Sequence, residues 1–252
     1  MEQIDQLLNG YKIIQDPQRF QFGIDAVLLA DFALKGTGWK DSVIDLGTGT
    51  GIIPLLMQGQ RKDGTFAGLE IQSESAEMAA RTVEMNGLQE KIRIVEGDVK
   101  KVSELFPKHS FNVVTSNPPY MINEHGHQNP GDAKAIARHE VLCTLEDVVA
   151  AADYLLLPHG KFFMIHRPFR LPEIFAAMQK HGMEPKRMRL VHPFADKEPN
   201  MVLIEARKNA KPRLEIESPL VVRNTDGEYT EEINEIYAKE SSECSQQSSL
   251  SD

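Results

Sequence analysis

The chain has 252 residues, of which 41% are hydrophobic, and it carries a formal net charge of −9. This length fits one large domain or two small ones, and no apolar run reaches membrane-spanning length, which argues against an integral membrane protein. Cys143 and Cys244 are too few for a disulfide framework, and residues 1–9 lack the apolar stretch of a signal peptide, so we expect a cytoplasmic protein.

The charge is distributed unevenly along the chain. Residues 161–213 hold 12 basic and 5 acidic residues, a net charge of +7, whereas residues 214–252 hold 2 basic and 10 acidic residues, a net charge of −8. The basic segment fits contact with phosphate groups, and its candidate side chains are Lys186, Arg187 and Arg189. A solvated surface without a ligand fits this segment equally well.

The first elements that we expect are a hairpin and an apolar helix. Two short β-prone runs, 11–14 and 20–22, flank Asp16-Pro17 and predict a hairpin with its turn at those residues. Residues 26–34 then predict a helix, with Asp25 as its N-cap and with glycines after its last turn. Asp25 is also a candidate for contact with a ligand.

A glycine-rich turn follows the first buried strand. Residues 42–46 predict the strand, residues 52–58 predict a helix, and Asp45-Leu46-Gly47-Thr48-Gly49-Thr50-Gly51 joins them. Glycines at alternate positions let the backbone approach a ligand closely, and the start of the helix offers unpaired N–H groups. Such a turn fits dinucleotides and other adenosyl ligands alike, so it does not identify the ligand by itself.

The next two predicted strands are also followed by carboxylates. Residues 65–69 lead to Glu70, which lies about as far beyond the glycine turn as the acidic residue that binds ribose in Rossmann-type sites. Residues 92–95 lead to Asp98, which is suited to accept a hydrogen bond from the exocyclic amine of an adenine. One such carboxylate is usually a surface residue, but three at successive strand ends, Asp45 included, favour a nucleotide-like site.

A fourth predicted strand, residues 111–115, is followed by Ser116-Asn117-Pro118-Pro119-Tyr120. Proline has no N–H for the ladder, so the chain leaves the sheet there, at the edge where open α/β sheets bind ligands. The Asn117 amide oxygen and the Pro118 carbonyl oxygen are suited to accept from the two N–H groups of an exocyclic amine, and Tyr120 to stack on a base. Taken alone, these five residues fit a plain strand end equally well.

The rest of the chain predicts a long loop at 121–135, a helix from 137 to about 157, a strand at 160–166, a helix at 171–181 and an antiparallel pair formed by 187–192 and 201–207. Residues 219–222 and 229–238 are a further possible strand and helix. No zinc-binding spacing connects the residues that we considered as metal ligands, so we expect no metal site; these are His125, His127, His139 and Cys143.

The glycine turn, Glu70, Asp98 and the tetrapeptide from Asn117 to Tyr120, in this order, resemble the class I S-adenosylmethionine-dependent methyltransferases over roughly residues 20–208. The tetrapeptide is similar to that of the amino-methyltransferases, which modify adenine N6, cytosine amines or glutamine side chains. Residues 22–30, Phe-Gly-Ile-Asp-Ala-Val-Leu-Leu-Ala, resemble the tRNA(Val) adenine-N6 methyltransferase family, which acts beside the anticodon.

This resemblance implies a Rossmann-like α/β fold with a seven-stranded, mostly parallel sheet and an antiparallel last strand. Together with the charge and the composition, it leads us to expect an N-terminal hairpin and helix packed on the core (1–40), the methyltransferase domain (41–213), an acidic extension (214–238) and a disordered tail (239–252). The acidic extension is not part of the family core.

The resemblance also implies S-adenosyl-L-methionine as the cofactor. Gly47 and Gly49 would line its methionine part, Glu70 would bind the ribose, and Asp98 with Val99 would bind the adenine. Asp45, Ile71 and Asn117 complete the expected cofactor site. The expected catalytic residues, which also hold the target base, are Asn117, Pro118 and Tyr120.

We expect the substrate to be tRNA, the product to carry a methyl group on adenine N6, and the protein to be a monomer. The alternatives are a protein glutamine N5-methyltransferase of the release-factor type and a non-catalytic RNA-binding protein on the same fold. Enzymes of the release-factor type resemble a chain with an added N-terminal helical domain, whereas residues 1–41 alone precede the first strand predicted for the sheet, which argues against this alternative. The intact set of cofactor residues argues against the non-catalytic RNA-binding protein. A DNA adenine methyltransferase would normally carry a target-recognition domain, which the sequence does not show.

Overall fold

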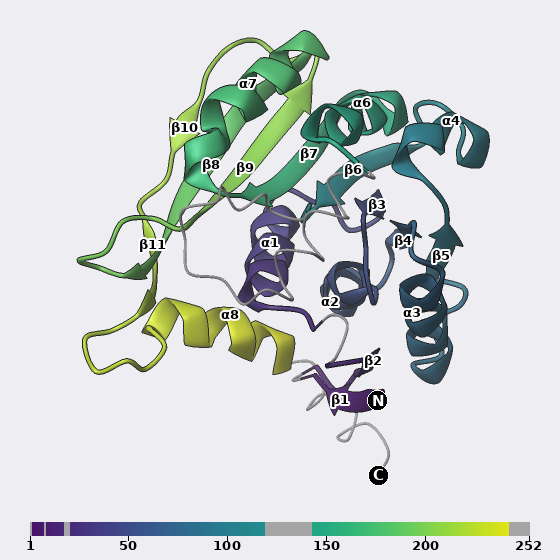
Figure 1. Cartoon of the computed structure of the whole chain (residues 1–252), viewed down its shortest axis with the longest axis horizontal. Coiled ribbons are helices and arrows are strands. Elements are labelled where there is room, and N and C mark those ends of the chain that lie inside the picture. Colours follow the sequence, from purple (N-terminus) through teal and green to yellow (C-terminus); the bar gives the residue numbers. More distant parts are fainter. Residues whose placement is uncertain (1, 8, 18–20, 119–142, 242–252) are drawn as a thin grey trace.

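Strands and helices alternate along most of the chain (Figure 1). A computed structural model describes residues 2–7, 9–17, 21–118 and 143–241. Its strands are β1 (Gln3–Gln6), β2 (Lys12–Gln15), β3 (Ser42–Leu46), β4 (Thr65–Glu70), β5 (Ile92–Glu96), β6 (Phe111–Ser116), β7 (Leu156–His166), β8 (Met183–Phe194), β9 (Met201–Lys208), β10 (Glu215–Ile216) and β11 (Leu220–Arg223). Its helices are α1 (Ile24–Leu34), α2 (Ile52–Gln60), α3 (Ser73–Met85), α4 (Val102–Leu105), α6 (Leu145–Leu155), α7 (Leu171–Lys180) and α8 (Glu231–Ser241), with short 3₁₀ turns η1 (Val99–Lys101) and η2 (Pro168–Arg170).

The central sheet has the order β10-β8-β9-β7-β6-β3-β4-β5, and β11 also pairs with β8. Strands β3 to β7 are parallel, and β9 runs antiparallel to both of its neighbours, β7 and β8. Seven of these strands, β3 to β9, form the predicted sheet, and its last strand is the reversed one. The predicted fold class and the predicted antiparallel pair are therefore confirmed, and two short strands extend the sheet beyond it.

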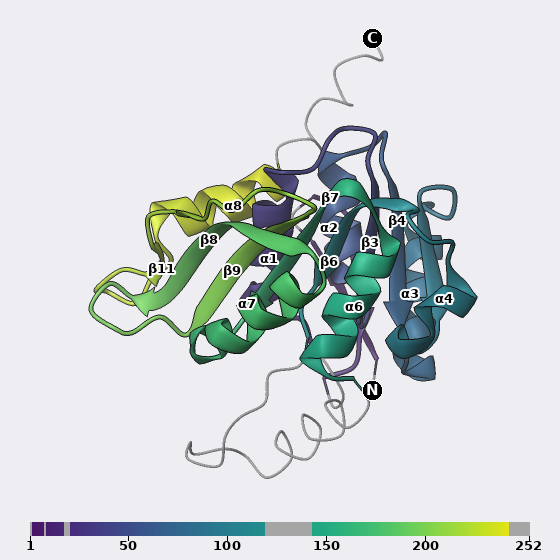
Figure 2. The same ribbon diagram turned by 90° about the horizontal axis from the view of Figure 1, so that it is seen from above.

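The sheet is buried on both faces because its strands alternate their side chains between two apolar layers. On β3, Val43 belongs to the apolar layer that also holds residues of α1, α2 and α8, whereas Ile44 belongs to the layer that holds residues of α4, α6 and α7. Figure 2 shows α6 and α7 on one side of the sheet and α8 on the other. Helix α1 is apolar along almost its whole length, since it lies between the sheet and the other helices of its layer.

The N-terminal hairpin differs from the prediction. Strand β2 pairs with β1, with Ile4 opposite Ile14, and not with residues 20–22; Phe22 lies in no strand, and residues 18–20 lie outside the described part of the chain. The turn is at Asn9-Gly10, where Gly10 has a φ of 84° and the Asn9 side chain accepts from the Tyr11 N–H. A polar strand such as β1 lacks the apolar signal used to find strands, and an Asn-Gly turn was the better indicator.

The acidic extension folds against the main domain. Strands β10 and β11 pair with β8 in parallel, and α8 packs on α1 and α2. The first residues of the tail assigned to 239–252 belong to α8, which continues to Ser241; residues 242–252 lie outside the described ranges. Within the described residues, no helix combines the length and the apolar character needed to cross a membrane.

Candidate active site

The register of the parallel strands brings four strand ends together. Leu46 at the end of β3 pairs with Leu69 of β4 on one side and with Ser116 of β6 on the other. Glu70, the last residue of β4, pairs with Glu96 at the end of β5. The segments that follow these strands therefore start at one edge of the sheet, which is the edge where ligands bind in open α/β folds.

The glycine turn folds back over the end of β4. The N–H groups of Gly47 and Thr48 both donate to the Leu69 carbonyl oxygen, at 2.9 and 3.1 Å. This approach needs a glycine on β4, because a Cβ added at Gly68 would lie 2.6 Å from Thr48 Cγ2. Gly47 has a φ of 73°, and no atom of the described residues would lie within 4 Å of its own added Cβ, so these residues leave open space beside Gly47.

Asp45 lies at this edge and is 1% exposed. Burial raises the pKa of Asp45 to about 7; the hydrogen bond from the Thr115 hydroxyl, at 2.7 Å, and the nearby Thr48 hydroxyl oppose this shift, and the charge of Glu70 adds to it. Asp45 Oδ2 is buried and has no hydrogen-bonding partner among the described residues. Such an atom is costly unless a ligand or water satisfies it, so the carboxyl group is suited to face a bound group.

Glu70 connects the glycine turn to the segment after β4. It is buried, and its carboxylate accepts from the backbone N–H of Gly49 at 2.8 Å and from that of Gln72 at 2.9 Å. Ile71 follows directly and is half-buried. Because two backbone segments fix this carboxylate, its remaining lone pairs point in defined directions, as the recognition of a diol requires.

Asp98 follows β5 and caps the short helix η1. Its Oδ1 accepts from the Lys100 N–H at 2.9 Å, and Lys100 Nζ lies 3.8 Å from Oδ2. Val99 is half-buried at the start of η1. The carboxylate is partly exposed, at 24%, so a ligand at this end of β5 can reach it.

The segment after β6 is held by both neighbouring elements. The Ser116 hydroxyl donates to the Leu46 carbonyl oxygen at 2.9 Å, and Asn117 Nδ2 donates to Asp25 Oδ2, also at 2.9 Å. Asp25 is therefore not the predicted N-cap of α1: Gly23 holds that position, without a side-chain cap, and Asp25 lies in the first turn. Pro118 is half-buried, and Tyr120 lies outside the described part of the chain.

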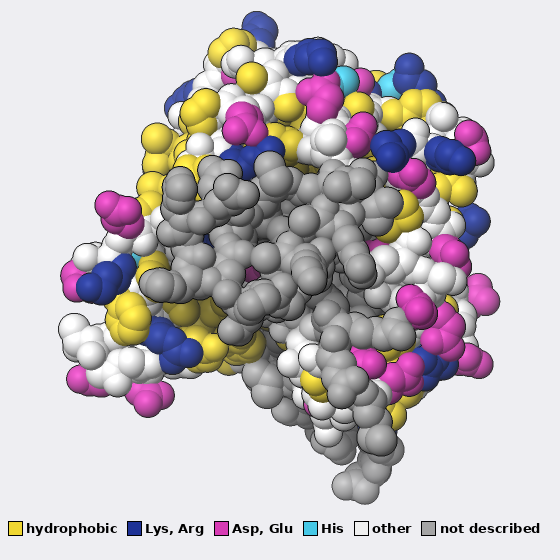
Figure 3. Space-filling view, viewed as in Figure 1, with side chains coloured by type: hydrophobic (Ala, Val, Ile, Leu, Met, Phe, Trp, Pro, Cys, Tyr) yellow, Lys and Arg dark blue, Asp and Glu magenta, His cyan; other side chains and the backbone are white. Residues whose placement is uncertain are grey.

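Two of the three predicted phosphate-binding side chains are held by acidic partners. Arg187 contacts Glu205 at 2.9 Å and Glu217 at 2.8 Å, and Arg189, which is 7% exposed, forms a two-pronged contact with Glu232. Lys186 is different, since its Nζ donates to a backbone carbonyl near the surface. On the face in Figure 3, described basic and acidic side chains lie interspersed. The two arginines thus attach the acidic extension to β8.

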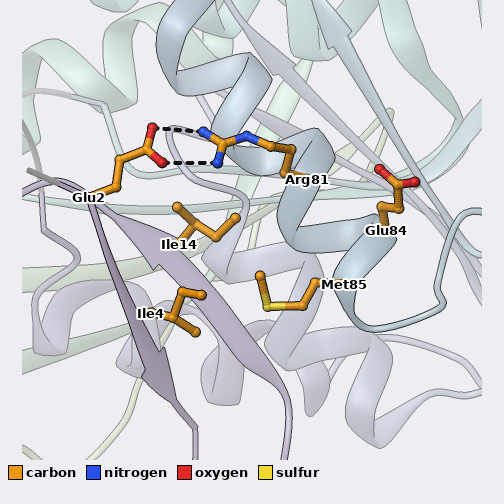
Figure 4. A pocket seen from close by; sticks show the side chains of 6 residues that line it. All are labelled: Glu2, Ile4, Ile14, Arg81, Glu84 and Met85. Atoms are coloured by element: carbon orange, nitrogen blue, oxygen red, sulfur yellow. Dashed lines mark hydrogen bonds and ion pairs between the residues drawn. The ribbon is translucent and has the colours of Figure 1, made fainter.

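A surface hollow of about 400 Å³ lies elsewhere, between the hairpin and α3 (Figure 4). Glu2 and Arg81 form an ion pair at its rim, and none of its lining residues is a predicted site residue. Its lining consists of Glu2, Ile4, Ile14, Arg81, Glu84 and Met85. We therefore place the candidate site at the strand ends, where the buried polar groups are.

The histidines considered as metal ligands, His125, His127 and His139, lie outside the described residues. Cys143 is described, and burial raises the pKa of its thiol to about 12. The thiol is therefore protonated at neutral pH and a poor ligand or nucleophile in this state.

Sequence reasoning missed Thr115, which is fully buried and binds Asp45. It named Asp25 as a candidate for contact with a ligand, but it did not predict that Asp25 binds Asn117 across 92 positions of sequence. A signal for both was present: Thr115 ends an apolar strand, and Asp25 opens an otherwise apolar helix. Polar residues at such positions indicate a partner or a ligand.

Comparisons with known proteins agree with this geometry. The family model of the methyltransferase small domain matches residues 24–180. A tRNA1(Val) (adenine(37)-N6)-methyltransferase of Tolumonas auensis is 26% identical over 224 residues, which cover 88% of this chain and 90% of that protein. A protein of the same name from Porphyromonas gingivalis is 27% identical over 228 residues, with 88% and 89% covered.

Solved structures share the fold. A predicted O-methyltransferase from Agrobacterium tumefaciens superimposes with a TM-score of 0.70 at 24% identity, covering 86% of this chain and 96% of that one. A geranyl diphosphate C-methyltransferase from Streptomyces coelicolor, solved with S-adenosyl-L-homocysteine, has a TM-score of 0.55 at 13% identity, covering 77% of this chain and 86% of that one. Since the family model spans more than half of the chain, this protein belongs to the methyltransferase small domain family.

Proposed function

We propose that this protein is an S-adenosylmethionine-dependent methyltransferase that modifies adenine N6 in RNA, with tRNA as the substrate. The observation that carries the proposal is the placement of the Asn117 amide, one strand away from the buried Asp45 carboxyl and the glycine turn. The relatives named tRNA1(Val) (adenine(37)-N6)-methyltransferases, which align over most of the chain, support the adenine and the tRNA.

The residues at the strand ends fit the cofactor. S-adenosylmethionine supplies a methyl group on a positively charged sulfur. The open space beside Gly47 accommodates a ligand close to the backbone, and Asp45 Oδ2, which accepts no hydrogen bond from the described residues, offers an acceptor to its methionine part. Glu70, fixed by two backbone N–H groups, would accept from the ribose hydroxyls, and Asp98 with Val99 would contact the adenine.

Methyl transfer to the target amine requires two hydrogen-bond acceptors and an aromatic ring that stacks on the base. An exocyclic amine on a base is a poor nucleophile because its lone pair is delocalised into the ring. The Asn117 amide oxygen and the Pro118 carbonyl oxygen would accept from its two N–H groups and so favour the pyramidal form, in which the lone pair is localised. Tyr120 would stack on the base, a contact worth ~1–3 kcal/mol. These residues act by geometry and by fixed dipoles.

The test is single-turnover methyl transfer from labelled cofactor to unmodified tRNA, followed by digestion and mass spectrometry of the nucleosides. We expect label in N6-methyladenosine, and we expect Asn117→Ala to remove most turnover while cofactor affinity stays within a few fold. Asn234→Ala, which removes an exposed amide on α8, is the matched control. A glutamine-containing release-factor substrate serves as the comparison: label there and not in tRNA would replace this proposal with the glutamine alternative.

We further infer that the protein acts as a monomer, and light scattering at working concentration tests this. For phosphate contacts, Lys186 remains a candidate, whereas Arg187 and Arg189 already have carboxylate partners.

A further inference from the structure

Asp25 and Asn117 meet although 92 positions separate them in the sequence. Asp25 lies in the first turn of α1, Asn117 directly follows β6, and Asn117 Nδ2 donates to Asp25 Oδ2 at 2.9 Å. Both side chains are half-buried, so water competes only partly for this hydrogen bond. A contact of this kind needs an explanation that neither helix capping nor core packing provides.

The chemistry of the pair determines how the Asn117 amide is turned. An amide group has a donor end and an acceptor end that are almost the same in shape, whereas an ionised carboxylate can only accept. Facing Asp25, the amide must present its NH₂ end, because the reverse orientation would place two oxygens against each other. The amide oxygen of Asn117 therefore points away from Asp25.

We propose that Asp25 is a positioning residue, which fixes the Asn117 side chain with its oxygen toward the amine to be methylated. This inference rests on the proposed function, since the amine is the group that needs this oxygen. If the Asn117 amide were turned the other way, its NH₂ group would face the NH₂ group of the target amine. Both groups are donors, so the target amine would lose the amide oxygen as an acceptor.

The carboxylate is well placed for this task because it sits on a rigid element. The rest of α1, from Ala26 to Leu34, is buried against the sheet. Asp25 Oδ1 accepts from the Ala26 N–H at 3.0 Å, and a Cβ added at Gly23 would lie 2.7 Å from the same oxygen. A carboxylate fixed in this way can hold its partner to within a fraction of an ångström, as positioning requires.

Exchanging the two side chains tests the proposal directly. Asn117→Asp alone would place two carboxylates at the distance of the present hydrogen bond, where like charges repel, so we expect single-turnover methyl transfer at pH 8 to fall about 100-fold or more. Asp25→Asn in the same chain restores a pair of one amide and one carboxylate. We expect the double variant to be at least about tenfold faster than Asn117→Asp. A double variant that is no faster would overturn the proposal.

A second comparison separates positioning from a structural role. Asp25→Ala removes the acceptor, and we expect the saturating single-turnover rate to fall about tenfold or more while the affinity for S-adenosylmethionine, measured by calorimetry, stays within about twofold. Asp31→Asn, which removes a charge from the same helix, is the control and should keep the parent rate. Parallel loss of rate and cofactor affinity in Asp25→Ala would show a structural role and refute positioning.

A spectroscopic readout keeps this inference separable from the proposed function. The side-chain NH₂ resonances of Asn117 report its hydrogen bond whether or not tRNA is the substrate. In the parent protein they should exchange slowly with water, and in Asp25→Ala at least about tenfold faster. Unchanged exchange would overturn the contact itself. Protection together with an absence of tRNA methylation would leave the contact in place and refute the proposed function.

Discussion

Replacing Asp45 by asparagine tests the electrostatics of the buried site. Burial raises the pKa of this carboxyl from 3.8 to about 7 in the folded protein. The folded chain therefore holds a proton that the unfolded chain releases at lower pH. The stability that this proton provides is fully present below the unfolded pKa and is lost as the pH rises through the folded one. Asparagine keeps the shape and the acceptor for Thr115 but cannot ionise.

The full shift corresponds to about 4 kcal/mol, and roughly 2–3 kcal/mol of it falls between pH 5 and pH 8. The assay is urea unfolding of the parent and of Asp45→Asn at both pH values. Other titrating groups are shared by the two proteins, so the difference between their unfolding free energies isolates Asp45. We expect Asp45→Asn to gain stability relative to the parent as the pH rises. Parallel pH dependences would refute a raised pKa at this site.

Three further predictions concern the cofactor site, the acidic extension and the target base. Glu70→Ala and Asp98→Ala should each weaken S-adenosylmethionine binding by ~1–3 kcal/mol in calorimetry, and unchanged affinity in both would contradict their assignment. Arg189→Ala removes the guanidinium partner of Glu232, so it should lower the unfolding free energy by ~1–3 kcal/mol. The dependence of tRNA affinity on salt concentration should stay like that of the parent, and a weaker dependence would show that Arg189 contacts RNA. Tyr120→Phe should be mild and Tyr120→Ala severe in single-turnover methyl transfer, and equal damage would mean that the hydroxyl, not the ring, is needed.

The core of the fold was predictable from local patterns because parallel strands are buried on both faces. Such strands are continuous apolar runs, and residues 42–46 and 111–115 were found in this way. The polar residue that ends each run then marks the ligand edge of the sheet. Asp45 and Glu70 were named for that reason, and the register places both at this edge.

The remaining features depend on contacts that a local pattern does not contain. Strand β1, the partner of β2, is polar, and in the sequence only the Asn9-Gly10 turn between the two strands indicates it. Arg189 was taken for a surface cation because the sequence does not reveal that α8 returns to place Glu232 against it. Asp25 resembles an N-cap in sequence, and only the fold brings Asn117 to it. Long-range pairing of this kind follows from topology and not from the residue types alone.

The two short strands of the acidic extension determine how the sheet ends. Without β10 and β11, β8 would present a long row of unpaired N–H and C=O groups, which is a template for pairing with another chain. With them, the outermost strands have two and four residues, too short to recruit a partner, and α8 folds back over the neighbouring layer. These two strands therefore protect the outer edge of β8 from pairing with another chain, and we expect a chain shortened at residue 213 to self-associate more readily than the full chain.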